Sequence, residues 1–131
     1  MIDKLAWIYL LDKKILCVRS KNKALYYIPG GKREPGETDQ QALIREIQEE
    51  LSVDLLPETI VFAGEFIAQA DGKEAGVQVK ITGYTAGYQG DLKPAAEIAE
   101  MAWLTYADRE KCSLVVQHIF DGLHQRDMLA D

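Results

Sequence analysis

The chain has 131 residues, of which 47% are hydrophobic and 27% are charged. This length predicts one domain, residues 1–131, with enough apolar content for a packed core. The formal net charge of −6 argues against a nucleic-acid polymer as partner, because such proteins carry basic patches. No apolar run reaches membrane-spanning length, and the first residues do not resemble a signal peptide. The two cysteines lack the spacing of a disulfide framework, so we expect them to be reduced and the protein to be cytoplasmic.

The first part of the chain predicts strands that lead into a glycine-rich loop. Two apolar segments, residues 5–11 and 14–19, flank a turn at Asp12 and Lys13. A shorter apolar segment at 26–28 comes next. We therefore expect a hairpin followed by a short strand that enters the loop.

The loop itself carries two tight-turn signals, Pro29-Gly30-Gly31 and Pro35-Gly36. Glycine allows the backbone to take positive φ angles and to come close to a ligand. Successive N–H groups in such turns can bind anions. The loop is therefore a candidate element for holding phosphate.

A helix is predicted directly after the loop, over residues 39–51. Thr38 and Gln41 have the spacing of a capping box, with Thr38 as the N-cap. Apolar residues recur at every fourth position, which gives the helix one core face: Leu43, Ile47 and Leu51. The helix is therefore amphipathic and packs one side against the core.

Beside this core face, the helix carries a cluster of carboxylates. Glu46 lies three residues from Glu49 and four from Glu50, so the three side chains are neighbours on the helix surface. A divalent cation would relieve their mutual repulsion. Oxygen ligands without His or Cys suit Mg²⁺ or Mn²⁺ rather than zinc. For the cluster alone, a solvated surface is the favoured interpretation, because glutamate-rich helix faces are common. The preceding glycine loop changes the balance in favour of a site for metal and phosphate.

The second half of the chain predicts more strands and one more helix. A hairpin is expected from residues 60–70 and 77–82. It is followed by a loop at 87–94, a short strand at 102–104 and a C-terminal helix at 113–128. Strands mixed with two helices predict an α/β fold with a sheet covered on both faces.

The segment from Gly31 to Val53 resembles the Nudix box, G-x₅-E-x₇-R-E-U-x-E-E-x-G-U, where U is aliphatic. Eight of the nine defined positions match. They are Gly31, Glu37, Arg45, Glu46, Ile47, Glu49, Glu50 and Val53, with one further position departing from the motif. The resemblance implies an α/β/α sandwich with a mixed sheet and a Mg²⁺- or Mn²⁺-dependent hydrolase of phosphoanhydrides.

The departure is Ser52, which stands where the motif has glycine. A glycine just past a helix end usually takes the left-handed conformation, so Ser52 either adopts it or the helix ends differently. For a residue other than glycine this costs roughly 1–2 kcal/mol. We expect Ser52 to alter local geometry and to leave the chemistry of the box intact.

The resemblance also implies a metal site and a general base. Glu46, Glu49 and Glu50 are the expected metal ligands, with Glu97 as a further ligand from an acidic segment later in the chain. The base is Glu46 or Glu49, with Glu97 or Glu100 as substitutes.

Other residues receive supporting roles from the same resemblance. Arg45 is expected to orient a catalytic glutamate, and Glu37 to brace the loop. Gly30 and Gly31 are expected to bind substrate phosphate. Arg19, at the end of the second strand, and Tyr26, before the loop, are further expected substrate contacts, with a surface or core role as the alternative for each.

The expected partner is a small-molecule nucleotide, in which a nucleoside diphosphate is linked to another group. Residues 67–71, downstream of the box, lack the proline of ADP-ribose enzymes and the tyrosine of dinucleoside polyphosphate enzymes. By elimination, a nucleoside triphosphate, as for MutT-type members, is the first choice. The alternatives are an ADP-ribose or nucleotide-sugar pyrophosphatase, a non-catalytic nucleotide-binding module, and an acidic surface helix on an unrelated domain. A homodimer is left open.

Overall fold

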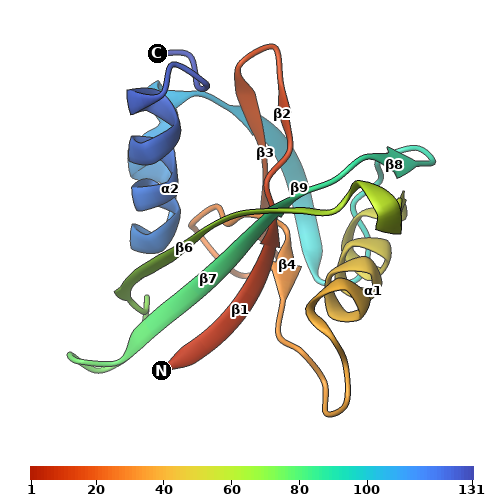
Figure 1. The fold of residues 1–131 in the computed structure, drawn as a ribbon. Coiled ribbons are helices and arrows are strands. Elements are labelled where there is room, and N and C mark those ends of the chain that lie inside the picture. The colour runs from red at the N-terminus through yellow and green to blue at the C-terminus, as the bar shows by residue number, and fades with distance from the viewer.

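The computed structural model describes all residues, 1–131. In chain order its strands and helices are β1 (Ile2–Trp7), β2 (Leu10–Leu11), β3 (Lys14–Ser20), β4 (Gly30–Gly31), α1 (Asp39–Leu51), β5 (Asp54–Leu55), β6 (Val61–Gln69), β7 (Gln78–Thr85), β8 (Tyr88–Gln89), β9 (Ile98–Leu104) and α2 (Leu114–Gln125). Short 3₁₀ segments lie at Pro57–Thr59 and Tyr106–Lys111. The two long helices lie on opposite sides of the strands (Figure 1).

The strands form two main sheets. A four-stranded sheet has the order β4-β1-β7-β6, and a three-stranded sheet has the order β2-β3-β9. The first sheet is mixed, because β1 pairs parallel with β7 while β6 pairs antiparallel with β7. The expected α/β architecture, a mixed sheet between helices, is confirmed.

Each helix covers its own hydrophobic core. The α2-side core joins α2 to the inner faces of β1, β3 and β7, and includes Ala6, Val79, Ile81, Val116 and Phe120. The α1-side core joins α1 to the other faces of β1 and β3, and includes Leu5, Trp7, Leu16, Leu43 and Ile47. Because successive residues of a strand point to opposite faces, β1 contributes to both cores.

The single strand expected over residues 5–11 is wrong, because two strands, β1 and β2, occupy this segment. The chain leaves one sheet and enters the other at Ile8 and Tyr9, between β1 and β2. Ile8 N–H still donates to Tyr84 of β7 at 2.8 Å, whereas the Tyr9 carbonyl accepts from Leu16 of β3 at 3.0 Å. A continuous apolar run cannot reveal such a change of pairing partner.

The turn between β2 and β3 falls where the sequence predicts it. Asp12 and Lys13 both have positive φ angles, 52° and 59°. Two left-handed residues make the two-residue hairpin turn that matches strand twist. The expected hairpin of β6 and β7 is also confirmed.

Three other elements differ in extent from the expectation. The strand expected at 26–28 is replaced by isolated bridges at Tyr26 and Tyr27. The strand expected at 102–104 begins earlier, as β9 starts at Ile98. The loop expected at 87–94 includes β8, which pairs with β5.

The helices agree with the sequence. The capping box at Thr38 is formed, and α1 ends at Leu51 as expected. The C-terminal helix, expected over residues 113–128, is α2, which has Ser113 as its N-cap and ends earlier than expected, at Gln125. Neither helix has the length and apolar character needed to cross a bilayer.

Candidate active site

A cavity of about 420 Å³ lies between the two cores. Its size falls in the range of roughly 300–1,000 Å³ that is usual for small-molecule sites. Its lining comes from β1, β3, the glycine loop, α1, the β6–β7 turn, β7, the segment before β9 and the start of α2. The cavity therefore joins the predicted phosphate loop and the acidic helix to parts of the chain that are distant in sequence.

The charged residues of the cavity are of both signs. Glu46 and Glu50 from α1, and Glu97 from the segment before β9, contribute carboxylates. Four lysines lie around the same cavity: Lys4, Lys23, Lys32 and Lys73. Lysine ammonium groups suit phosphate, and carboxylates suit a cation that would bridge to phosphate. The arrangement is thus suited to a polyphosphate bound together with a divalent cation.

Gly30 is required by the close approach of two backbones. It has φ 151°, and a Cβ added there would lie 2.0 Å from the carbonyl oxygen of Leu5. Pairing of β4 with β1 brings the two segments together. The N–H of Gly30 donates to Glu50 Oε1 at 3.1 Å, which joins the loop to the acidic helix.

Gly31 is required by the carboxylate of Glu46. A Cβ at Gly31 would lie 2.5 Å from both the Cδ and the Oε2 atom of Glu46. Real Cβ atoms do not approach other atoms so closely. The glycine at this position of the box therefore provides the space in which the Glu46 carboxylate rests.

Arg45 connects the loop to the carboxylates of α1. Its guanidinium donates two hydrogen bonds to Glu37, at 2.8 and 2.9 Å, and one to Glu46 at 2.9 Å. A further hydrogen bond reaches the carbonyl of Lys32 at 3.1 Å, and Glu49 Oε2 lies 3.5 Å from the same group. Arg45, with a hydrogen bond from the N–H of Glu34, lowers the pKa of Glu37 to about 2. The ion pair therefore stays formed at neutral pH.

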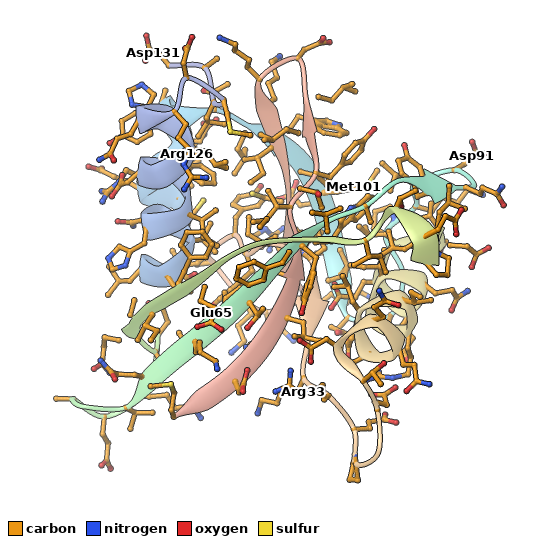
Figure 2. All side chains as sticks on the ribbon, in the orientation of Figure 1. Arg33, Glu65, Asp91, Met101, Arg126 and Asp131 are labelled. Atoms are coloured by element: carbon orange, nitrogen blue, oxygen red, sulfur yellow. The ribbon has the colours of Figure 1, made fainter.

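A second arginine fixes the other end of the loop. Arg33 donates to Asp39 at 2.7 Å and to Asp3 of β1 at 2.9 Å, and Figure 2 shows it reaching from the loop toward β1. Tyr84 of β7 donates to the same Asp39 at 2.5 Å. The loop between β4 and α1 is thus tied to two strands and to the helix N-terminus before any ligand binds.

Glu50 is the most strongly perturbed carboxylate of the site. Only 6% of the residue is exposed. Burial raises its pKa to about 8, and the nearby charges of Glu46 and Glu97 add to this effect against the opposing hydrogen bond from Gly30. Burial also raises the pKa of Glu46, although Arg45 opposes it. A cation beside these groups would favour their ionised forms.

The donor set fits a hard divalent cation. No three His, Cys, Asp or Glu side chains are gathered closely enough to bind a metal ion by themselves. Mg²⁺ commonly uses one or two carboxylates and completes its coordination with water and substrate phosphate. Because Arg45 contacts Glu46 and Gly30 contacts Glu50, the protein alone already holds these carboxylates at the cavity.

Ser52 has the conformation expected from its position. Its φ and ψ angles are 65° and 20°, and its N–H donates to the carbonyl of Gln48. The Ser52 hydroxyl donates to the carbonyl of Lys93 at 3.3 Å. Ser52 is not part of the cavity lining, so this departure from the motif lies at the helix exit, apart from the carboxylates that line the cavity.

Arg19 and Tyr26 lie together but outside the cavity lining. Arg19 Nε donates to Glu100 Oε1 at 2.8 Å, and the Tyr26 hydroxyl donates to the same oxygen at 2.6 Å. Glu100 is likewise outside the lining, whereas Glu97 is within it. Tyr27, the neighbour of Tyr26, lines the cavity in its place. The difference of one residue decides which side chain faces the site.

The sequence did not single out several residues that line the cavity, among them Lys4 and Ser113. The sequence pattern could have singled out Lys4, because it alternates along the strand with apolar residues that pack in or against the α2-side core: Ile2, Ala6 and Ile8. A lone lysine on an apolar strand face indicates a special environment. Ser113 had no such signal beyond its position before a helix.

Comparison with known proteins agrees with this geometry. The model of the NUDIX domain matches residues 3–118. The CTP pyrophosphohydrolase of Escherichia coli (strain K12) is 35% identical over 80 residues, a match that covers 58% of this chain and 55% of that protein. The chain thus matches only about half the length of this curated relative.

Solved structures share the fold. The solution structure of the E. coli ORF135 protein superimposes with a TM-score of 0.74 at 23% identity, over 97% of this chain and 91% of that chain. The MutT protein from Methanosarcina mazei Go1 gives a TM-score of 0.77 at 20% identity, over 96% and 94% of the respective chains. The family model and the shared fold together show that this chain belongs to the NUDIX domain family and has the α/β Nudix fold.

Proposed function

We propose that this chain is a Mg²⁺-dependent pyrophosphohydrolase of nucleoside triphosphates, with CTP as the first substrate to test. The observation that carries the proposal is the cavity that places Glu46 and Glu50 among four lysines, beside a preformed glycine loop. The family supports a Nudix hydrolase, and the name of the E. coli relative supports CTP.

The phosphates are bound by the glycine loop and the lysines. Gly30 and Gly31 contribute through their position: Leu5 and the Glu46 carboxylate fill the space beside them, so the loop brings Glu46 and Glu50 to the phosphates. Lys4 and Lys32 provide positive charge on the cavity wall. Burial and the nearby Lys32 lower the pKa of Lys4, so a bound phosphate also relieves an unfavourable charge environment.

Glu46, Glu49, Glu50 and Glu97 are the carboxylates from which Mg²⁺ would take one or two ligands, with water and substrate phosphate completing its coordination. When bound, the ion would neutralise phosphate charge and lower the pKa of a water molecule. The buried position of Glu50 supports the role of ligand, because a buried carboxylate is poorly accommodated as an anion without a nearby cation.

A carboxylate of α1 accepts the proton of the attacking water. The water oxygen forms a bond to phosphorus while the phosphoanhydride bond breaks, and the proton passes to Glu46 or Glu49. For Glu46, a pKa raised by burial brings the group closer to the value that suits a general base at neutral pH. Arg45 is a positioning residue, since it contacts Glu46 and lies near Glu49.

A substrate screen with product identification tests this function. The purified chain is incubated with the nucleoside triphosphates, ADP-ribose, a nucleotide sugar and a dinucleoside polyphosphate, each with Mg²⁺ or with EDTA. We expect nucleoside monophosphate and pyrophosphate from CTP only when Mg²⁺ is present. Exclusive cleavage of ADP-ribose or a nucleotide sugar would support the alternative substrate class. Binding of nucleotide without any cleavage would support the non-catalytic module.

A further inference from the structure

Arg19, Tyr26 and Glu100 form a hydrogen-bonded cluster at the end of β3, outside the cavity lining. Arg19 Nε and the Tyr26 hydroxyl donate to the same oxygen of Glu100, at 2.8 and 2.6 Å. The hydrogen bond from Tyr26 and that from Arg19 hold the pKa of Glu100 below its usual value, so the carboxylate stays ionised at neutral pH. The pairing of β3 with β9 is irregular here, which brings Glu100 opposite Arg19 and Ile98 opposite Ser20. The end of β3 is therefore held by β9 through side chains as well as backbone.

Arg19 also braces the β3 turn (residues 20–23), which follows directly. Its Nη1 group donates to the carbonyl of Lys23 at 2.9 Å, and the N–H of Lys23 donates to the carbonyl of Ser20 at 3.1 Å. Asn22, inside the turn, has a left-handed φ of 66°, a conformation that asparagine tolerates better than most residues. Arg19 thus joins β9 to the far end of the turn.

The β3 turn presents Lys23 to the cavity. Lys23 is part of the cavity lining, whereas Arg19 is not. Burial is the main cause that lowers the pKa of Lys4 in this cavity, and the charges of Lys32 and Lys23 act in the same direction. The ammonium group of Lys23 is therefore close enough to affect a charge on the cavity wall.

The other half of the β3 turn is held by backbone alone. The N–H of Lys21 donates to the carbonyl of Glu97 at 2.7 Å. This bond does not involve the side chain of Arg19, so it stays when that side chain is shortened. Removal of the Arg19 guanidinium would therefore release the Lys23 end of the turn and leave the segment that carries Glu97 in place.

We propose that Arg19 acts on the substrate through Lys23, by holding the β3 turn so that the Lys23 ammonium meets a substrate phosphate. Arg19 is then a positioning residue, in contrast to the direct substrate contact expected from the sequence. Its Nε and Nη1 atoms already have partners, the Glu100 carboxylate and the Lys23 carbonyl. A lysine binds phosphate as a point charge, so its contribution depends on where its ammonium group is held. The inference rests on the proposed function and deepens it, because it assigns one cavity lysine to a phosphate and names what holds it.

A double-mutant cycle tests this coupling on the nucleoside triphosphate that the wild type cleaves fastest. The variants are Arg19→Gln, Lys23→Met, which keeps an apolar stem, and the double variant. We expect Lys23→Met to raise KM about tenfold, as for the loss of one charge-assisted hydrogen bond, with kcat within about twofold of the wild type. Arg19→Gln should raise KM by about three- to tenfold in the wild-type background, and by less than about twofold when Lys23 is already replaced.

Arg19→Lys separates positioning from direct contact. A lysine keeps the positive charge but cannot donate to Glu100 and to the Lys23 carbonyl with the geometry of a guanidinium. If Arg19 itself bound phosphate, Arg19→Lys would keep more affinity than Arg19→Gln, because a lysine also binds phosphate. The proposal instead predicts that KM rises nearly as much in Arg19→Lys as in Arg19→Gln.

Arg126→Gln is the matched control, because Arg126 is exposed and lies outside the lining of this cavity. Its KM and kcat should equal those of the wild type. Thermal unfolding of each variant separates positioning from a general loss of structure. Arg19→Gln should lower the Tm by a few degrees at most, because the ion pair of Arg19 with Glu100 is partly exposed.

The outcomes distinguish failure of this inference from failure of the proposed function. If the wild type cleaves a nucleoside triphosphate and Arg19→Gln raises KM equally with and without Lys23, Arg19 acts independently of Lys23 and the inference is refuted. An unchanged KM in Lys23→Met or in Arg19→Gln also refutes it, as does a fall in Tm with lower kcat and unchanged KM. If the wild type cleaves no nucleoside triphosphate, the proposed function fails and this inference with it.

Discussion

Replacement of Gly31 by alanine provides a direct test of how the glycine loop positions the acidic helix. The added Cβ would lie 2.5 Å from the carboxylate of Glu46, whereas an ordinary contact begins at 3.4 Å. One of the two groups must therefore move by roughly 1 Å, and the end of a flexible side chain moves more easily than paired backbone. A displacement of about 1 Å at a catalytic group can reduce the rate by about 10²-fold.

We expect Gly31→Ala to lose about 10²-fold in Mg²⁺-dependent kcat while its Tm stays close to that of the wild type. Gly30→Ala should behave in the opposite way. Its Cβ would meet the Leu5 carbonyl at 2.0 Å, and its φ angle disfavours alanine, so the variant should lose stability first. Gly122→Ala is the control, because a Cβ there meets nothing within 4 Å.

The assay combines initial rates of CTP cleavage with thermal unfolding of each variant. In a helix, alanine is favoured over glycine by about 1 kcal/mol, so Gly122→Ala should keep its rate and gain stability. If Gly31→Ala keeps a rate within about threefold of the wild type, the Glu46 carboxylate does not need the position described here, and the reasoning is refuted.

Three further predictions concern charge and backbone strain. The pKa of Glu50 rises from 4.5 to about 8 on folding, so the metal-free protein should lose stability as pH rises from about 4.5 to 8. The loss, measured by urea unfolding, should be at most roughly 4–5 kcal/mol. Glu50→Gln should remove this dependence of stability on pH. Arg45→Lys should lower kcat by about 10- to 100-fold, because lysine cannot bridge Glu37 and Glu46 together. In a double-mutant cycle, adding Glu37→Gln to Arg45→Lys should lower kcat little further. Ser52→Gly should raise the free energy of unfolding by up to about 1–2 kcal/mol and leave kcat unchanged, because it relieves a left-handed φ of 65°; a loss of activity would show that Ser52 matters to the site.

The local features of the fold could be predicted, because they depend on neighbouring residues. The capping box at Thr38 and the periodic apolar face set the bounds of α1. The two-residue turn at Asp12 and Lys13 was marked by its composition. The parallel pairing of β1 with β7 was not predictable, because it joins residues about 77 positions apart, as in Ile2 with Val79. The exchange of sheets at Ile8 and Tyr9 follows from this pairing.

The candidate site divides in the same way. The glycine loop, Arg45 and the carboxylates lie in one continuous segment, so their spacing indicated a shared site. The other half is assembled from separate elements, among them Lys4 on β1 and Ser113 before α2. No local pattern connects these residues. Tyr27, which lines the cavity next to the predicted Tyr26, shows the limit, since strand-like alternation without a known register does not say which neighbour faces the cavity.

The central claim is that the carboxylates of α1 support metal-dependent cleavage of a phosphoanhydride. The most direct measurement is the initial rate of CTP cleavage against Mg²⁺ concentration for the wild type, Glu49→Gln and Glu50→Gln. Glu110→Gln, an exposed position outside the cavity lining, is the matched control. We predict a fall of about 100-fold or more for both α1 variants, at unchanged fold by circular dichroism, and no change for the control. Near-normal Mg²⁺-dependent rates in Glu49→Gln and Glu50→Gln would contradict the account.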